Sequence, residues 1–147
     1  MTTSAHDIAK FIIQKSQTPI SNLKLQKLLY YAQGWHLGIY EEPIFTEQIQ
    51  AWIHGPVVPA VFQTYREFKW TPISVDPTPV KMNASTSKHV LGILGAFGKF
   101  TASQLEAISH KEDPWIKARK GFDPKSPSKA VITHDSMKRY FGKLANG

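Results

Sequence analysis

Two segments of the chain concentrate side chains that could do chemistry or hold a partner. In the first, Trp52 and His54 stand directly before the rigid pair Gly55-Pro56. An aromatic ring and an imidazole on a rigid turn form a good anchor for a protein partner, because aromatic residues dominate binding energy at interfaces. The alternative is structural: Trp52 packs on the second predicted helix while Gly-Pro makes the turn. The residues alone leave both interpretations open.

The second segment, residues 108–115, holds His110 three residues before Asp113. This pair could act as an acid and a base. The alternative is that Asp113 caps a helix beginning at Pro114, while His110 bonds locally. Neither segment supplies a nucleophile, a base and anion-stabilising donors together, so the chemistry disfavours an enzyme. An enzyme would need His54 and His110 to meet in a cleft.

Composition excludes several other classes of site. The 147 residues include no cysteine, which excludes disulfide scaffolds, cysteine zinc sites and thiol nucleophiles. No two of the six histidines lie three or four residues apart, and the glycines fit no phosphate-binding loop. We therefore expect no metal and no cofactor. No apolar run is long enough for a membrane helix and no secretory signal is present, so we expect a soluble, cytoplasmic protein without membrane contact.

The positive charge gathers near the C-terminus. Lysine and arginine number 18 against 11 carboxylates, and residues 117–147 account for +6 of the net +7. This asymmetry suggests an acidic protein surface or nucleic acid as the partner, although a solvated face that keeps the chain soluble is the simpler alternative. Candidate contacts in this third are Lys117, Arg119, Lys120, Lys138 and Arg139.

The spacing of apolar residues predicts the elements that carry these side chains. We expect one mainly α domain over residues 1–147, an α+β arrangement of about six to seven helices with a small β-hairpin near residues 44–53. The helix from Ser21 to Leu37, ended by Gly38, is apolar on more than half its circumference and should be the buried centre. The predicted helices span residues 5–16, 21–37, 59–70, 85–98, 101–110 and 114–120, with a last one after Thr133 or Asp135.

A proline-rich loop over residues 71–84 separates the N-terminal and C-terminal halves. In the helix that follows, Gly92 and Gly95 each cost about 1 kcal/mol, which implies close packing or local strain. The predicted core comprises Ile8, Phe11, Ile12, Leu25, Leu28, Leu29, Ala32, Phe62, Leu91, Leu94, Leu105, Ile108 and Phe141.

Several blocks in order carry a resemblance to a known family. They are residues 23–35 (LKLQKLLYYAQGW), 47–59 (EQIQAWIHGPVVP) with Val61 and Tyr65, then Phe100-Thr101-Ala102, Leu105, Ser109-His110, Asp113-Pro114-Trp115 and Ala118-Arg119, and finally Ile132 with Tyr140-Phe141. From about residue 5 to residue 143 the chain resembles the Panacea domain, the SocA-like antitoxin family of bacteria and phages.

This resemblance implies an antitoxin that neutralises a cognate toxin by direct protein contact. It also implies a AAA+ protease as a further partner, since one relative is described as an adaptor that delivers its toxin to such a protease. The alternative is a phage-associated or transcriptional regulator that binds nucleic acid through the basic C-terminal third. Our candidate partner contacts, besides the basic residues above, are Trp52, His54, Gly55, Pro56, Val57, Tyr65 and Trp115.

Overall fold

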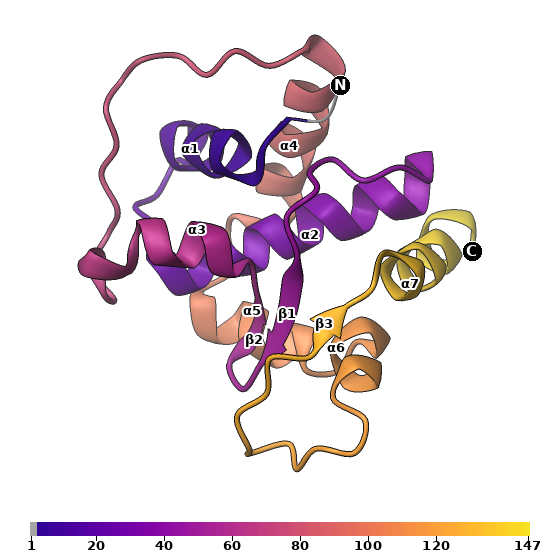
Figure 1. Cartoon of the computed structure of the whole chain (residues 1–147). Helices are drawn as coiled ribbons and strands as arrows, with labels where there is room; N and C mark the ends of the chain where they lie inside the picture. Colours follow the sequence, from indigo (N-terminus) through magenta and orange to yellow (C-terminus); the bar gives the residue numbers. More distant parts are fainter. Residues whose placement is uncertain (1–2) are drawn as a thin grey trace.

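The computed structural model describes residues 3–147, and helix α2 (Asn22–Tyr40) runs through its centre (Figure 1). The other helices pack around it, so the prediction of a mainly α fold with a buried second helix is confirmed. They are α1 (Ala5–Lys15), α3 (Pro59–Thr64), α4 (Ala84–Phe97), α5 (Ala102–Ser109), α6 (Asp113–Ala118) and α7 (His134–Asn146), with a short 3₁₀ helix at Arg66–Phe68. No helix within residues 3–147 is long and apolar enough to cross a membrane.

Side-chain caps fix where most helices begin. Ser4, Ser21 and Thr133 each accept a hydrogen bond from a backbone N–H in the first turn. Thr101 and Gln104 form the reciprocal capping box that the sequence predicts. Helix α4 begins one residue earlier than predicted and is capped by Asn83, whose side chain accepts from the N–H of Thr86. Asp113 does not cap α6, because it is already the first residue of that helix.

Helix α2 continues through Gly38, where we predicted its end. It stops at Glu41, which adopts a left-handed conformation with φ 61°. Gly34 and Gly38 instead make room for α7: a Cβ atom at Gly34 would lie 2.2 Å from Phe141 Cε2, and one at Gly38 only 2.6 Å from the Phe141 backbone. These glycines therefore serve helix packing rather than termination.

The predicted hairpin exists but is displaced along the chain. Strands β1 (Ile49–Trp52) and β2 (Gly55–Val57) pair antiparallel, with Trp52 opposite Gly55. The pair Gly55-Pro56 therefore belongs to a strand, and the turn lies at residues 53–54. A third strand, β3 (Val131–Ile132), pairs with the other edge of β1 and gives the order β2-β1-β3. Two residues are too few for a recognisable alternation, so the sequence did not indicate β3.

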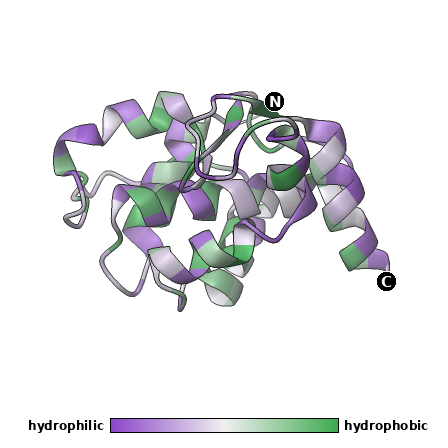
Figure 2. Cartoon of the chain, turned by 90° about the horizontal axis from the view of Figure 1, so that it is seen from below, coloured by the Kyte–Doolittle hydropathy of each residue, from purple (hydrophilic) through white to green (hydrophobic). Residues whose placement is uncertain are grey.

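One hydrophobic core combines residues from both sides of the 71–84 segment, and most helices carry both hydrophobic and hydrophilic residues (Figure 2). Leu91 was predicted to be in the core but is 47% exposed, while Phe62, Leu94 and Ile108 are only partly buried. The confirmed core residues are Ile8, Phe11, Ile12, Leu25, Leu28, Leu29, Ala32, Leu105 and Phe141.

Buried polar side chains of α2 connect this helix to the chain segments around it. Gln33 donates from Nε2 to the Phe45 carbonyl at 2.8 Å and accepts from the N–H of Ile44 at 2.8 Å. Gln26 accepts from the N–H of Val58 at 2.9 Å, directly after β2. Each bond satisfies a backbone group that burial would otherwise leave unpaired. Helix α2 thereby fixes both ends of the segment that carries the hairpin.

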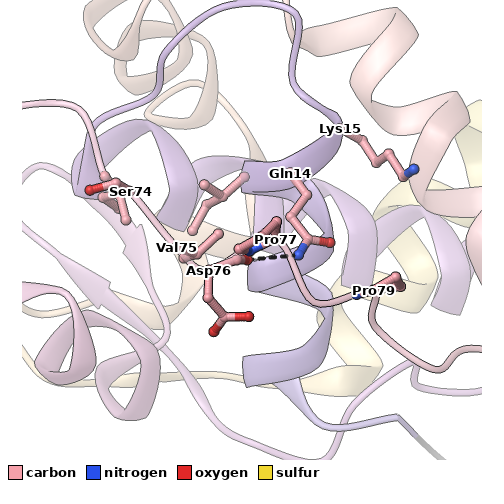
Figure 3. A pocket seen from close by; sticks show the side chains of 9 residues that line it. Gln14, Lys15, Ser74, Val75, Asp76, Pro77 and Pro79 are labelled. Atoms are coloured by element: carbon pink, nitrogen blue, oxygen red, sulfur yellow. Dashed lines mark hydrogen bonds between the residues drawn. The ribbon is translucent and has the colours of Figure 1, made fainter.

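The proline-rich segment over residues 71–84 lies alongside α1 and is hydrogen-bonded to it (Figure 3). Gln14 donates to the carbonyls of Asp76 and Thr78, at 3.1 and 2.8 Å. Lys10 Nζ lies 2.9 Å from Asp76 Oδ1, and this hydrogen bond lowers the pKa of Asp76 to about 2. A shallow pocket of about 500 Å³ lies between the segment and α1.

Candidate functional site

The hairpin turn and helices α5 and α6 form one surface, which we call the hairpin–α6 face (residues 52–54, 106 and 113–120). Two hydrogen bonds attach α6 to β1. Trp115 Nε1 donates to the Trp52 carbonyl at 2.8 Å, and Arg119 Nη1 donates to the Ala51 carbonyl at 2.9 Å. The two segments that the sequence singled out separately are therefore neighbours in the fold.

Trp115 is the centre of a three-layer stack beneath this face. Its ring lies parallel to His110, with centroids 4.1 Å apart, and the Arg119 guanidinium lies 4.9 Å from the Trp115 ring on a cation–π contact. Trp115 is only 6% exposed. Burial lowers the pKa of His110 and so disfavours its charged form. Trp115 was a candidate partner contact, but its buried ring holds the face together instead.

Arg119 also differs from its predicted role as a surface charge. It is 4% exposed, and its guanidinium donates to the carbonyls of Ala51, Asp123 and Ser126. The loop after α6 folds around this side chain. Arg119 is suited to this position because its planar group offers five N–H donors in fixed directions.

The residues Gly55, Pro56 and Val57 were candidate contacts and are all buried. Gly55 has φ 108°, and a Cβ atom there would lie 2.9 Å from Lys27 Cε and 3.1 Å from Ser109 Oγ. Glycine is required because a larger residue would be strained and would collide with α2 and α5. These three residues shape the hairpin and are not accessible to a partner.

Three predicted contacts remain exposed on the hairpin–α6 face. His54 is 65% exposed by its side chain, with Nδ1 3.4 Å from Glu106 Oε2. Lys117 pairs with Asp113 at 3.7 Å, and Lys120 is exposed beside it. Trp52 is half-buried, and its ring packs against Phe62 of α3 with centroids 5.2 Å apart.

The other predicted contacts lie elsewhere. Lys138 and Arg139 are on α7, where they pair with Glu41 at 3.1 Å and Asp135 at 3.0 Å. Tyr65 follows α3 and is half-buried next to Phe68. The structure therefore brings together the candidates of the hairpin and of α6, and separates those of α3 and α7 from them.

A buried carboxylate was missed by sequence reasoning. Glu112 Oε1 accepts hydrogen bonds from the hydroxyls of Tyr30 and Tyr31, at 3.0 and 3.1 Å. Burial raises the pKa of Glu112 to about 7, although the two hydroxyls favour its charged form. Burial also raises the pKa of both tyrosines, so they remain donors. The adjacent tyrosines within an apolar helix were a signal, since a buried hydroxyl needs a partner.

Lys27 is the second missed group. It is 1% exposed, and its Nζ has no hydrogen-bond partner among residues 3–147. Burial lowers the pKa of Lys27 to about 8, with an opposing effect from Glu106. Lys24, one turn earlier, is also buried but donates to the Gly98 carbonyl at 2.6 Å. Lysine side chains are usually exposed even on an apolar helix, so no local signal predicted the burial of Lys24 or Lys27.

Glu106 brings several titratable groups into one neighbourhood, because it lies beside His54 and acts electrostatically on both Lys27 and His110. The meeting of His54 and His110 that an enzyme would need is therefore present around Glu106. Yet Ser109, which lies with Lys27 beside Gly55, is fully buried and donates to the Glu106 carbonyl. Within the described part of the chain, no group of three histidine or carboxylate side chains could hold a metal ion. The accessible part of this neighbourhood is the exposed surface above it, which is suited to binding.

Residues 25–116 match the family described as antitoxin SocA-like, Panacea domain. The chain belongs to this family. It is also similar to Antitoxin SocA of Caulobacter vibrioides (strain NA1000 / CB15N), with 30% identity over 132 residues that cover 78% of this chain and 69% of the relative. No solved structure shows significant similarity to it. The Panacea match includes α2, the hairpin and α6 as far as Ile116, and the resemblance noted in the sequence is thus confirmed.

Proposed function

We propose that this Panacea protein is a cytoplasmic antitoxin that neutralises a cognate toxin by direct binding through the hairpin–α6 face. The observation that carries the proposal is an exposed apolar side chain on a helix that hydrogen bonds fix in place. Buried Trp115 and Arg119 fix α6 against the sheet, and Ile116 is left 45% exposed beside Lys117. Apolar side chains surrounded by polar and charged ones are typical of protein interfaces.

The charges of this face favour an acidic toxin surface. Lys117 is exposed on α6 and Lys120 just after its end, and Lys125 and Lys129 lie in the exposed loop that follows. Phe122 and Val131, 49% and 42% exposed, add apolar area at the two ends of that loop. Complementary charge accelerates association, so we expect binding to slow as salt rises.

We further propose that the protein acts without catalysis. The hydroxyl and amine that could serve as reactive groups, Ser109 and Lys27, are covered by the hairpin. Delivery of the bound toxin to a AAA+ protease would be a second step, and it would need a surface that stays free in the complex.

Co-expression with the product of the adjacent gene tests this function. We expect the neighbour to inhibit growth when expressed alone, and this chain to restore growth and co-purify with it. The double variant Lys117→Glu/Lys120→Glu should weaken binding and reduce its salt dependence. The matched control, Lys81→Glu/Lys143→Glu, changes the net charge equally at exposed sites outside the face and should bind normally. A harmless neighbour that forms no complex would contradict the proposal.

Nucleic-acid regulation remains the second candidate function. It is favoured by Lys120, Lys125, Lys129 and Lys143, which have no acidic partner among residues 3–147. It is disfavoured by the ion pairs of Lys138 and Arg139 on α7. DNA binding that falls steeply with salt would support this function, and no mobility shift at low salt would remove it.

A further inference from the structure

Helix α4 has an exposed face flanked by two grooves, which we call the α4 face (Lys88, Leu91, Gly92, Gly95, Ala96 and Lys99). On one side, a largely apolar groove of about 570 Å³ separates α4 from the last turns of α2, where Ile39 and Tyr40 are 50% and 57% exposed. On the other side, a groove of about 390 Å³ lies between α4 and the end of α1.

The two glycines of this face have no role inside the molecule. A Cβ atom at Gly92 or Gly95 would meet nothing within 4 Å. Of the two explanations that we predicted for these glycines, close packing is not found within residues 3–147, and neither glycine has the positive φ that would indicate local strain. Glycine weakens a helix interior relative to alanine, so two exposed glycines impose a loss of stability that no contact of the described residues offsets.

The charged side chains that line the α4 face and its two grooves are lysines. Helix α4 contains no acidic residue, and Lys88 and Lys99 lie at the two ends of the glycine stripe. Lys15 borders the second groove. None of these three lysines has an acidic partner among residues 3–147. Lys15 and Lys99 lie over their neighbouring rings, Phe11 and Phe100, at 5.8 and 5.4 Å.

We propose that the α4 face is a second docking surface and that its occupant is an acidic amphipathic helix of the bound protein partner. The apolar side of that helix would enter the grooves, and its carboxylates would meet Lys15, Lys88 and Lys99. A second copy of this chain is a poor occupant, because a symmetric contact would place these lysines against one another. Identifying the partner as the toxin rests on the proposed function; the chemistry of the surface does not.

The geometry favours a helix over an extended strand. Helix α4 pairs the backbone groups of its interior within the helix and offers no open sheet edge to an extended strand. Gly92 and Gly95 allow the backbone of a second helix to approach closely, as small residues do at helix crossings. Side chains at helical spacing on the second helix would then straddle α4 and reach both grooves.

A designed peptide tests the surface independently of any toxin. We would titrate a helical peptide of leucine, alanine and glutamate, with leucines on one face, into the isotope-labelled chain and follow the amide shifts. We expect changes grouped on α4 and the end of α2, and at least about tenfold weaker binding by Gly92→Leu. Leucine is a better helix former than glycine, so this variant should remain folded. Equal binding by Gly92→Leu, or shifts grouped elsewhere, would overturn the proposal.

The product of the adjacent gene provides the second measurement. Ala96→Leu should weaken its binding, whereas Ala60→Leu, the same change at an exposed alanine of α3, should not. If the product binds wild type and Ala96→Leu equally, the α4 face is not the docking surface for that protein. If the product binds no form of the chain while the peptide binds α4, the proposed antitoxin function fails and the docking surface stands.

Discussion

The hairpin–α6 face and the α4 face use their conspicuous residues in opposite ways. On the hairpin–α6 face, Trp115 and Arg119 are directed inward, and hydrogen bonds occupy Trp115 Nε1 and both Nη atoms of Arg119. On the α4 face, Gly92 and Gly95 border open space, and the exposed Lys88 and Lys99 have no acidic partner within residues 3–147. The residue types most typical of binding interfaces are therefore not those available to bind. Whether a side chain can bind a partner depends on whether contacts within the fold already bury it or use its polar groups.

This difference predicts that substitutions will separate into two classes. Changes beneath the hairpin–α6 face should reduce the stability of the free protein. Changes on the α4 face should leave stability unchanged or raise it, and should affect binding.

The largest effect is expected at Arg119. Arg119→Ala removes the donors to the carbonyls of Ala51, Asp123 and Ser126, and should lower the free energy of unfolding by about 3 kcal/mol. Urea denaturation measures this loss. The adjacent exposed residue is the control: Lys120→Ala should change stability by less than about 0.5 kcal/mol. Similar values for both variants would show that the guanidinium does not hold the loop.

Replacing glycine by alanine at two helical positions should change the stability of the protein in opposite directions. Gly38→Ala places a methyl group against α7 and should destabilise the protein by about 2 kcal/mol. Gly92→Ala enters open space and should stabilise it by about 1 kcal/mol through helix propensity. Thermal unfolding of both variants measures the contrast. A destabilised Gly92→Ala variant would mean that α4 has an internal contact at this position.

Glu112 should make stability depend on pH. Its pKa is about 7 in the folded state against an ordinary value of 4.5, so the folded protein holds the proton more tightly than the unfolded chain. Its contribution to stability is thus complete below pH 4.5 and is lost as the pH rises to about 7, with a slope of at most about 1.4 kcal/mol per pH unit. Glu112→Gln should flatten this part of the curve, whereas the exposed control Glu67→Gln should keep it.

The smallest effect concerns Lys27. Lys27→Met removes a buried ammonium group without a hydrogen-bond partner in the described chain and keeps a side chain of similar length. We expect stability to rise by about 1 kcal/mol at pH 7. The gain should shrink between pH 8 and 10.5, because the folded wild type loses the Lys27 proton before the unfolded chain does. A loss of stability would show that the ammonium group has a stabilising contact.

Local signals in the sequence predicted most of the fold. Periodicity located α1, α2 and α5, and the capping pair Thr101 and Gln104 fixed the start of α5. The end of α2 could not be read from Gly38, because the same residue type ends helices and also admits a packed neighbour. That choice depends on Phe141, about a hundred residues later. The strand β3 likewise exists only through its pairing with β1.

The candidate site was predictable in outline but not in detail. Spacing identified the segments around Trp52 and Trp115, which are indeed in contact. It could not show that Trp115 would be buried, or that Glu112 would meet Tyr30 and Tyr31, because burial arises from long-range packing. The exposure of Leu91 was missed for the same reason: its position on α4 fits an apolar face that no other element covers.

The close contact of Gly34 and Gly38 in α2 with Phe141 has a consequence for where this domain ends. The family match stops at Ile116, whereas the ring packed against these glycines belongs to Phe141, on a helix beyond the match. Phe141 also contacts the rings of Tyr30, Tyr31 and Trp35. A fragment cut at the boundary of the match would leave these aromatic rings facing water. The stretch by which relatives are recognised is therefore shorter than the stretch that must fold together.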